Sequence, residues 1–370
     1  MGSLISAVLI VKDEEKYLAA CLESVAKVAD EIVVVDTGSR DRSREIALAH
    51  GARVADFQWN DDFAAARNRG LDEAAGDWIL YIDADERLRT YDRSRLTGEL
   101  SEPGLCACRV RFYPQTGFTA YREHRLFRRD PRIRFHGGIH ETMMAGLNRI
   151  VAAGQGRVGS SDLTIDHLGY DGNPSRKAER NLPLLEKQVR VEPARTYLWW
   201  HLGCVYRDLG RPRDAEAAWR RGVEATRRSS VRQAVDTLCF VELAKLRLLE
   251  REEAIELVRE AAAIQPDNLL LKWLEARIHA AAGRYEEAIS IFARLANIDA
   301  KNLVADLAYD SRILGAWAYA EMGNCAFQMR HYRDSEKWYR EAQELEPGCL
   351  EFRVKRSLAN KRANNQSEDF

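Results

Sequence analysis

Apolar and polar residues follow two different periods in the two halves of the chain. In the first half, short runs rich in Val and Ile, such as Leu4 to Val11, Glu31 to Asp36 and Trp78 to Ile82, alternate with stretches of helical spacing, such as Glu15 to Val28 and Phe63 to Ala75. Strands that alternate with amphipathic helices are typical of βαβ units and a parallel sheet. The first half is therefore predicted to be an α/β domain.

The rest of this half is less regular. The pattern predicts a helix from Ser39 or Asp41 to about Ala49, a strand over 52–55, antiparallel strands within 106–167, and a connecting helix over 173–191 that contains Pro183. Cys106 and Cys108 are two residues apart in one of these strands, so we expect them on one face, buried and inert.

Beyond Pro193 the pattern is helical only, and it repeats. The first copy has large and small residues at the spacings that interlock two helices, namely Trp199, Leu202, Gly203, Tyr206, Ala215 and Trp219. The small residue of the second helix recurs as Ala215, Ala254, Ala288 and Ser335, and Pro266 and Pro347 end two copies. This pattern resembles the tetratricopeptide repeat, and a last helix over about 350–362 is expected to cap the stack.

Composition narrows the classes of function. The chain has 370 residues, which favours two domains, and 56 Lys plus Arg nearly cancel 57 Asp plus Glu. Such a balance gives no overall field for nucleic acid or an anionic membrane. No run approaches the roughly 18 apolar residues of a membrane span, and the start of the chain has no signal-peptide pattern, so we expect a cytoplasmic protein. Seven scattered cysteines do not form a disulfide framework.

Acidic residues stand where the predicted strand over 78–82 ends. Asp83 and Asp85 are separated by one residue, so both side chains point to the same side of the chain. In open α/β sheets, ligands bind at the carboxyl ends of the strands. Two carboxylates there suit a divalent cation, which offsets the negative charge of a departing diphosphate. Solubilising the strand end is the competing interpretation of an isolated Asp-x-Asp.

The neighbouring strand ends carry further polar residues. The first strand runs into Val11-Lys12-Asp13-Glu14-Glu15 and has no glycine-rich phosphate loop, which argues against dinucleotide binding. The second ends at Asp36, which is suited to a uracil or ribose edge. Arg67 and Asn68 lie on the helix before the acidic strand, where a guanidinium reaches a nucleotide or the acidic motif. A surface ion pair is the alternative for Arg67.

These motifs together resemble glycosyltransferase family 2. The resemblance rests on 11-VKDEE-15, 33-VVVDTGS-39, 63-FAAARN-68 and 83-DADE-86, in this order and spacing, and it covers roughly the first 170 residues. With the repeats, the chain resembles the bacterial subgroup that includes glycocin-type peptide S- and O-glycosyltransferases. The resemblance implies a GT-A nucleotide-diphospho-sugar transferase domain over 1–172, a linker helix over 173–194 and a tetratricopeptide-like domain over 195–365.

The resemblance also assigns roles to residues. It implies a UDP-sugar donor bound by Val11, Lys12, Glu14, Asp36, Arg67, Asp83 and Ala84, with Asp36 at the uracil and Asp83 at the ribose. It implies Mn²⁺ or Mg²⁺ bound by Asp85, with His167 completing the metal shell. Asp13 stands where many relatives have asparagine, and the Gln-x-x-Arg-Trp motif of processive synthases is absent from the sequence.

The resemblance also implies inversion of the anomeric configuration, and inverting transfer needs a base near the attacking group of the acceptor. Glu141 is the first candidate and His140 the second, while a structural role remains the alternative for His140 and His167. A cysteine acceptor would need less help from a base than a serine, because a thiol ionises more easily. The sequence does not choose between them.

Two further features bear on partners. Six arginines between 122 and 134 form a basic run that suits a diphosphate or an anionic acceptor, although a solvated hairpin face is the commoner origin of such a run; they are Arg122, Arg125, Arg128, Arg129, Arg132 and Arg134. The repeat domain offers a concave surface for acceptor recognition or for self-association as a homodimer.

The sequence therefore predicts an inverting, metal-dependent transferase that moves glucose or N-acetylglucosamine from UDP to Ser or Cys of a peptide. A lipopolysaccharide-core, other glycan or lipid-linked acceptor is the second hypothesis. A non-catalytic scaffold that senses a nucleotide is the third.

Overall fold

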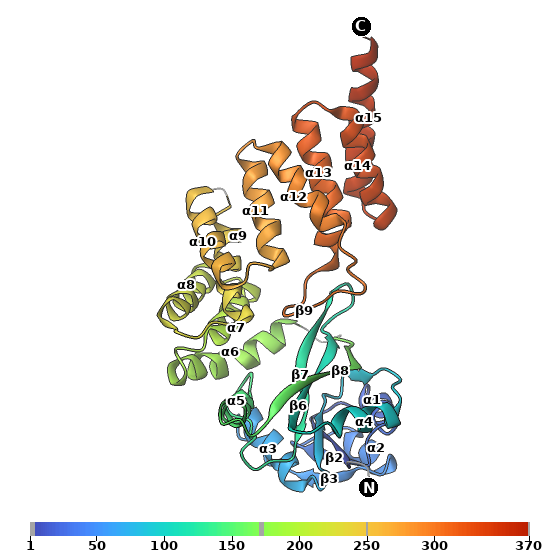
Figure 1. Cartoon of the computed structure of the whole chain (residues 1–370), viewed down its shortest axis with the longest axis vertical. Helices are drawn as coiled ribbons and strands as arrows, with labels where there is room; N and C mark the ends of the chain where they lie inside the picture. Colours follow the sequence, from blue (N-terminus) through green and yellow to red (C-terminus); the bar gives the residue numbers. More distant parts are fainter. Residues whose placement is uncertain (1–3, 170–173, 249–250, 369–370) are drawn as a thin grey trace. The chain divides into compact units, whose positions relative to one another are not determined.

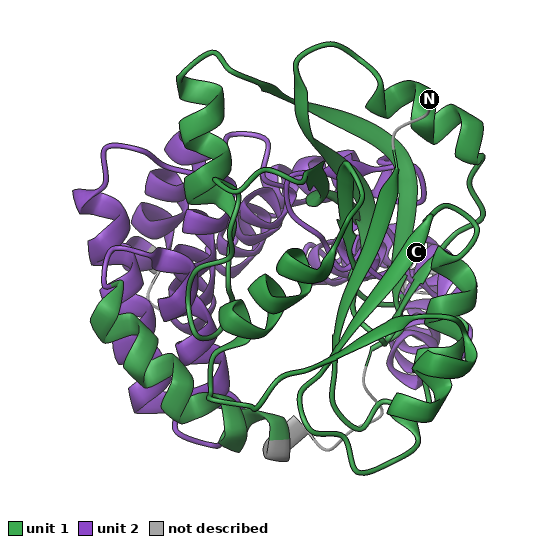
Figure 2. Cartoon of the chain, turned by 90° about the horizontal axis from the view of Figure 1, so that it is seen from below, with its two compact units in different colours: residues 1–116, 120–192 green, residues 117–119, 193–370 purple. Residues whose placement is uncertain are grey.

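The computed structural model describes residues 4–169, 174–248 and 251–368. The chain divides into two compact units, coloured separately in Figure 2. Unit 1 comprises residues 1–116 and 120–192, and unit 2 comprises residues 117–119 and 193–370.

Unit 1 is built on one mixed sheet (Figure 1). Its strands are β1 (Ile5–Val11), β2 (Glu31–Asp36), β3 (Arg53–Asp56), β4 (Trp78–Tyr81), β5 (Glu86–Leu88), β6 (Leu105–Tyr113), β7 (Ala120–Arg128) and β8 (Arg157–His167). In the described residues they lie in the order β3-β2-β1-β4-β7-β6-β8-β5. Strands β1 to β4 are mutually parallel, and β7 pairs antiparallel with both β4 and β6.

Helices cover both faces of this sheet. They are α1 (Leu18–Val25), α2 (Ser43–Ala49), α3 (Phe63–Glu73), α4 (Arg93–Leu100) and α5 (Met144–Ala152), and α6 (Pro174–Val191) follows the sheet. Alternate residues of β1 bury against opposite layers: Leu9 packs in the cluster that contains α1, α2 and α4, and Val8 in the cluster of α3 and α5. This is the alternation that a strand buried on both faces requires.

Local signals explain where helices start and how closely they pack. Asp62 caps α3 by accepting a hydrogen bond from the backbone N of Ala65 at 2.9 Å. A Cβ atom on Gly70 would overlap Cγ1 of Val8 and crowd Val35. Glycine therefore allows α3 to lie directly against β1 and β2.

The strand order reverses between β1 and β4. From β1 the chain proceeds to β2 and β3 on one side, and then returns to place β4 on the other side. Ligands of open α/β sheets bind outside the carboxyl ends of the strands at such a switch point. The ends of β1 and β4 are Val11 and Tyr81, so the motifs after them lie at this position.

Parts of the irregular region differ from the sequence prediction. The sequence prediction did not include helices α4 and α5. Strand β8 pairs parallel with β6, although antiparallel strands were expected. The expectation that Cys106 and Cys108 share a face is wrong: they pack in opposite core clusters. The pairing register of β6 with β8 shifts between Leu105 and Ala107, and this irregularity changes the phase of the side chains.

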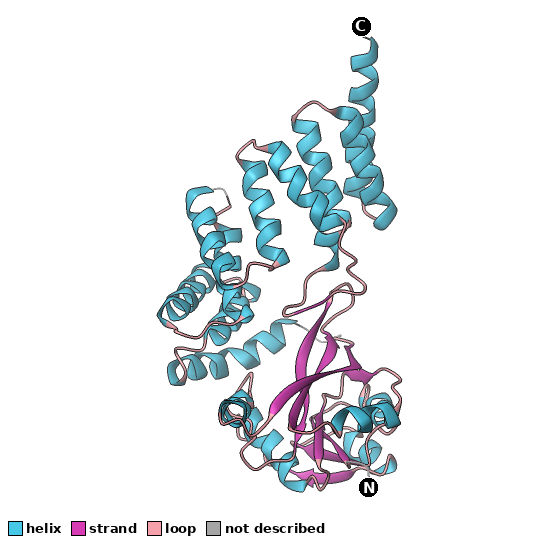
Figure 3. Ribbon diagram, in the orientation of Figure 1, coloured by secondary structure: helices cyan, strands magenta, loops and turns pink. Residues whose placement is uncertain are grey.

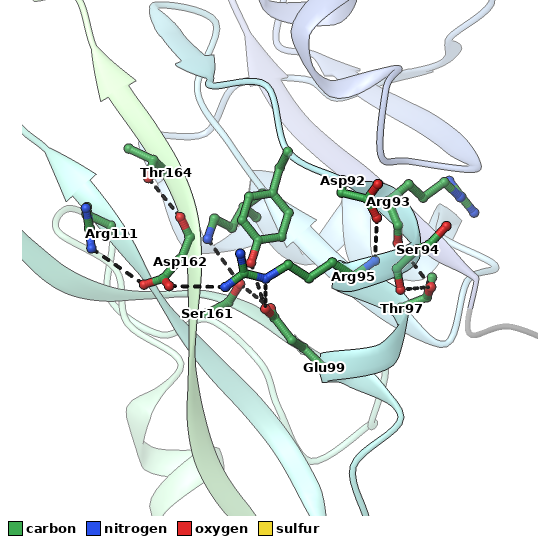
Figure 4. Close-up of polar contacts among 12 residues, drawn as sticks. Asp92, Arg93, Ser94, Arg95, Thr97, Glu99, Arg111, Ser161, Asp162 and Thr164 are labelled. Carbon is green, nitrogen blue, oxygen red and sulfur yellow. Dashed lines mark hydrogen bonds and ion pairs between the residues drawn. The ribbon is translucent and has the colours of Figure 1, made fainter.

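An ion-pair cluster ties α4 to the strands beside it (Figure 4). Asp162 on β8 lies 3.2 Å from Arg95, 3.5 Å from Arg111 and 3.2 Å from Arg122. Glu99 on α4 accepts hydrogen bonds from Arg95 and from the hydroxyl of Ser161. Half of the Asp162 side chain is exposed, so each of these pairs contributes little to stability.

Unit 2 consists mainly of helices (Figure 3). They are α7 (Thr196–Asp208), α8 (Pro212–Arg228), η1 (Ala234–Thr237), α9 (Leu238–Leu246), α10 (Arg251–Ile264), α11 (Leu269–Ala281), α12 (Tyr285–Ala296), η2 (Ser311–Leu314), α13 (Ala316–Gln328), α14 (Tyr332–Leu345) and α15 (Leu350–Glu368), with the two-residue strand β9 (Val304–Ala305). Successive helices pack as hairpins, among them α7 with α8, α11 with α12 and α13 with α14. The last helix, α15, is longer than expected.

The first repeat shows how its pattern works. A Cβ on Gly203 in α7 would overlap the indole of Trp219 in α8, so the glycine makes room for the tryptophan. Trp219 is 2% exposed, and its Nε1 donates to the carbonyl of Trp200 at 3.2 Å. It is a packing residue of the repeat.

No helix in the described part of the chain is long and apolar enough to cross a membrane. All seven cysteines fall within the described residues and are free thiols. Burial raises the pKa of the Cys108 thiol to about 12, which keeps it protonated and unreactive.

Candidate active site

The segment after β4 presents alternate side chains to opposite sides. Asp83 and Asp85 are partly exposed, whereas Ala84 and Glu86 are buried, at 4% and 1% exposure. The two carboxylates therefore share the open side at the end of β4, as the one-residue spacing predicts.

His167 lies beside Asp85. Strand β8 pairs antiparallel with β5, and its register sets His167 opposite Glu86. Nε2 of His167 is 3.0 Å from Oδ2 of Asp85, and Nδ1 is 2.7 Å from the carbonyl oxygen of Pro114. A carbonyl only accepts hydrogen bonds, so Nδ1 carries a proton, and the lone pair of the neutral ring is on Nε2, facing Asp85.

These two side chains fit a divalent cation. An imidazole nitrogen and a carboxylate oxygen are ligands that Mn²⁺ accepts, and the Pro114 carbonyl orients the ring as an outer partner of a metal-bound histidine does. Among the described residues, no group of three His, Cys, Asp or Glu side chains is arranged as a metal site. A cation held here would need further ligands from a substrate.

The hydrogen bond to Asp85 is also the main cause of a change in the titration of His167. It raises the pKa of the imidazole to about 9, against the opposing effect of burial. Without a cation, the pair is therefore an imidazolium and a carboxylate at neutral pH.

Arg67 joins two acidic residues. It lies on α3, is 8% exposed, donates from Nη2 to Asp83 at 2.9 Å and from Nε to Glu141. Its guanidinium lies 5.1 Å from the ring centre of Tyr81. Burial alone would raise the pKa of Asp83, but the charges of Arg67 and Arg125 outweigh it and hold that pKa below its usual value. Asp83 is therefore ionised.

Residues of α3 hold the loop that contains His140 and Glu141 through hydrogen bonds. The side chain of Asn68 donates to the carbonyl of Phe135 and accepts from its backbone N, both at 2.9 Å. The backbone N of Phe63 donates to the carbonyl of Gly138 at 3.0 Å. His140 has φ of 50°, a left-handed conformation uncommon for a residue other than glycine. Strained backbone of this kind often occurs at functional sites.

The donor residues expected at the ends of β1 and β2 lie in two interlocked loops. Oδ1 of Asp36 accepts from the backbone N of Gly38 and Ser39, at 3.1 and 2.8 Å, so this oxygen is already used within the loop. Asp13 has φ of 56° and accepts from the backbone N of Arg40 at 2.7 Å.

The other donor candidates differ in what they expose. Val11 is buried, and its carbonyl accepts from Thr37. Lys12 is exposed, and Glu14 is half-buried. The carbonyl of Ala84 accepts from Nη1 of Arg87 at 2.8 Å. Lys12 is thus the candidate among these whose side chain extends into solvent.

The six arginines of the basic run have partners within unit 1. Arg122 and Arg125 pair with Asp162 and Glu86, Arg128 stacks on Trp78, Arg129 donates to the carbonyl of Gly76, and Arg132 and Arg134 pair with Asp130 and Asp72. Only Arg125 reaches the acidic motif.

The partnership of Arg125 with Glu86 is the part of this site that sequence reasoning missed. The two side chains form a bidentate pair at 2.8 and 3.1 Å, and their residues are 5% and 1% exposed. Burial raises the pKa of Glu86 to about 7, against the opposing effect of the charge of Arg125. The sequence did contain a signal for this pair. Glu86 directly follows Asp83-Ala84-Asp85, and the alternation of side chains along this segment places Glu86 on the buried side.

Comparison with known proteins decides the family of the first unit. Residues 6–157 match the model of glycosyl transferase family 2, and residues 250–308 and 318–349 match tetratricopeptide repeat models. Residues 6–157 are a family 2 glycosyltransferase domain. The GT-A-like sheet and the repeats predicted from the sequence are thereby confirmed.

Two curated relatives are similar to parts of this chain. A TPR repeat-containing protein of Synechococcus elongatus is 36% identical over 234 residues, 60% of this chain and 57% of that protein. The prophage-derived glycosyltransferase SunS of Bacillus subtilis is 30% identical over 199 residues, 50% of this chain and 45% of that protein. The chain thus spans about half the length of these relatives.

A solved structure also aligns with the glycosyltransferase domain. It is glucosyl-3-phosphoglycerate synthase of Mycobacterium tuberculosis, in complex with Mn²⁺, uridine diphosphate and glucosyl-3-phosphoglycerate. The alignment has 18% identity and a TM-score of 0.38, and covers 51% of this chain and 80% of that one.

Proposed function

We propose that this protein is a cation-dependent, inverting glycosyltransferase that moves a hexose from a UDP-sugar to a Ser or Cys side chain of a peptide. The observation that carries the proposal is that His167 lies beside Asp85 at the switch point of a family 2 domain. Asp83 lies two residues before Asp85. Glucose and N-acetylglucosamine are the proposed sugars.

In this proposal, Asp85 and His167 hold Mn²⁺ or Mg²⁺. A bound cation would supply positive charge at the diphosphate and so stabilise the leaving group. Asp83 is held ionised by Arg67 and, by its place beside Asp85, is proposed to accept hydrogen bonds from the ribose. Oδ1 of Asp36 is used within its loop, so Oδ2 is the atom proposed to meet the uracil. Lys12, Val11, Glu14 and Ala84 are proposed to line the nucleotide.

Glu141 is the proposed base for the acceptor, and His140 remains the second candidate. Arg67 donates to Oε1 of Glu141, which leaves Oε2 as the oxygen to take the proton of the attacking hydroxyl or thiol. A peptide acceptor is favoured because helical repeats provide extended surfaces that suit a chain. The repeat domain is also the proposed site of any homodimer contact.

The test uses the whole chain with UDP-glucose and UDP-N-acetylglucosamine, with and without Mn²⁺. UDP release into water in the absence of an acceptor is expected for one donor, with Mn²⁺ present. Asp85→Asn and His167→Gln should each reduce that release at least tenfold, since losing a metal ligand or its outer partner typically costs 10–100-fold or more. Asp162→Asn, in the ion-pair cluster of Figure 4, should leave it unchanged.

The same assay separates the rival hypotheses. If no donor is cleaved under any condition, the result favours the nucleotide-sensing scaffold over the transferase. If donor is cleaved, intact-mass analysis after incubation with candidate peptides and with glycan acceptors distinguishes the two acceptor classes. A mass increase of one hexose on a Ser or Cys peptide is the result expected here.

A further inference from the structure

The turn that carries Asp83 and Asp85 is closed by one residue, Glu86. The backbone N of Glu86 donates to the carbonyl of Asp83 at 3.0 Å. In return, the backbone N of Asp83 donates to Oε2 of Glu86 at 2.9 Å. The two ends of the acidic motif are therefore bonded to each other through a single side chain.

Arg125 on β7 fixes that side chain. Its Nη2 donates to Oε1 of Glu86 at 2.8 Å and its Nη1 to Oε2 at 3.1 Å. The guanidinium also lies 4.5 Å from the ring centre of Tyr81 and 4.7 Å from that of Phe112, and its Nε is 3.1 Å from Oε2 of Glu123. Two aromatic contacts, a bidentate pair and this further ion pair restrict the orientation of the guanidinium.

The pair is costly to bury. Both residues are 5% exposed or less, and the cost of removing two charges from water is about what their mutual attraction returns. Replacing such a pair with well-packed apolar residues is often neutral for stability. Stability alone therefore gives no reason for a charged pair at this position, whereas a fixed geometry does.

We infer that Glu86 and Arg125 are positioning residues, which hold the Asp83–Asp85 turn in the geometry that binds a divalent cation and a nucleoside diphosphate. The inference rests on the proposed function, because it assigns the pair to the same site. Both residues are buried, so the proposed effect is exerted through the turn and not by direct contact with a ligand. The backbone N of Asp83 is fixed by Glu86, and the carbonyl of Asp85 accepts from the backbone N of Leu168 at 3.0 Å, next to His167. Both motif carboxylates thus depend on this turn.

The test measures binding of Mn²⁺ in the presence of UDP by calorimetry, together with thermal unfolding, for the whole chain. The central variant combines Glu86→Gln with Arg125→Met. It removes both charges of the pair. Glu123, whose Oε2 lies 3.1 Å from Nε of Arg125, loses its partner but is partly exposed, so the melting temperature is expected to stay within a few degrees of the wild type. Its affinity for Mn²⁺ is expected to fall about 10–100-fold, the usual effect of losing an outer partner of a metal site.

Two further variants keep the result interpretable. Glu86→Gln alone retains an oxygen for the backbone N of Asp83 but loses the charge that Arg125 binds. If the double variant does not fold, the Mn²⁺ affinity of this single variant is measured instead and is expected to fall as well. Asp162→Asn is the matched control, because it also removes the partner of arginines on β6 and β7 but lies outside the motif. Its affinity for Mn²⁺ should be unchanged.

The outcomes are distinct. Weakened Mn²⁺ binding in a folded double variant, with the control unchanged, supports the positioning role. A double variant that binds Mn²⁺ as tightly as the wild type, whether or not its melting temperature falls, overturns the positioning role and leaves the proposed function intact. A wild-type protein that does not bind Mn²⁺ with UDP at all overturns the proposed function, and the inference with it.

Discussion

Nε2 of His167 lies 3.0 Å from Oδ2 of Asp85, 82 positions away in the sequence. His167 ends β8, and Asp85 lies in the turn directly before β5, the strand that pairs with β8. In the absence of a cation, the hydrogen bond that the imidazole donates to this carboxylate raises the pKa of His167 to about 9. A cation must displace the proton on Nε2 before it can bind there.

Cation binding should therefore depend on pH with a defined sign. Below pH about 9 each bound Mn²⁺ should release close to one proton, so the affinity should rise about tenfold per pH unit between pH 7 and 9 and level off above. Calorimetry in buffers of different ionisation enthalpy counts the released protons. Asp85→Asn, which removes the cause of the raised pKa, should flatten the dependence; a wild-type affinity that is constant over this range contradicts the assignment.

In the cation-free protein the same pair should contribute to stability. Because the pKa of His167 is raised on folding, its contribution is fully present below pH about 6.5, the ordinary value, and is lost as the pH rises through about 9. Urea unfolding at pH 6 and pH 9.5, for the wild type and for His167→Gln, isolates this contribution. The variant should show a smaller loss of stability between the two pH values than the wild type.

Glu141 should matter for transfer and little for donor binding. Glu141→Gln keeps a side-chain oxygen facing Arg67 but removes the base, so kcat for transfer to a serine peptide should fall about 10²–10⁴-fold. Binding of UDP with Mn²⁺ should change less than about threefold. If the variant instead loses UDP binding and retains kcat, Glu141 belongs to the donor site, and His140 becomes the base candidate.

Asn68 should act through the loop that it fixes. Asn68→Ala leaves the backbone N and carbonyl of Phe135 without their side-chain partner, which should cost about 1–3 kcal/mol of unfolding free energy. Chemical denaturation measures this cost. Asn302→Ala, at an exposed position in unit 2, is the control and should change stability by less than about 0.5 kcal/mol. Equal effects of the two substitutions would remove the role given to Asn68.

Two glycines of the glycosyltransferase domain should respond in opposite directions to alanine. Gly70→Ala places a Cβ into Val8 and should destabilise by about 1–3 kcal/mol. Gly98 lies within α4 with open space around it, so Gly98→Ala should stabilise by about 0.5–1 kcal/mol. Melting temperatures of the two variants test this packing of α3 on β1. A Gly70→Ala variant as stable as the wild type contradicts it.

The sequence was sufficient for the parallel part of the sheet. Runs such as Glu31 to Asp36 are β-branched and buried on both faces, so period and composition agree, and the strand has the predicted bounds. Helices α4 and α5 were missed because each is short and contains a glycine, Gly98 and Gly146. In α4, only Leu96 and Leu100 are apolar. The prediction that Cys106 and Cys108 lie on one face of the strand was wrong, because nothing in the residues themselves indicates the register shift in β6.

The site was predictable where a strand end fixed the position. Asp83 and Asp85 follow β4 directly, so alternation placed both on one side. The contacts of Arg67 with Glu141 and of Glu86 with Arg125 join residues 74 and 39 positions apart, and they depend on how β7 and the loop after it return to β4. Such contacts follow from the register of long-range pairing, which local patterns do not contain.

The central claim is that His167 and Asp85 hold the cation of a nucleotide-sugar site. The most direct test is pulsed electron paramagnetic resonance of Mn²⁺ bound to the protein with UDP, which detects a nitrogen nucleus coordinated to the metal. If His167 coordinates the metal, the wild type should show an imidazole nitrogen signal, and this signal should disappear in His167→Gln. A wild-type Mn²⁺–UDP complex without nitrogen coupling, or a coupling that persists in the variant, contradicts it.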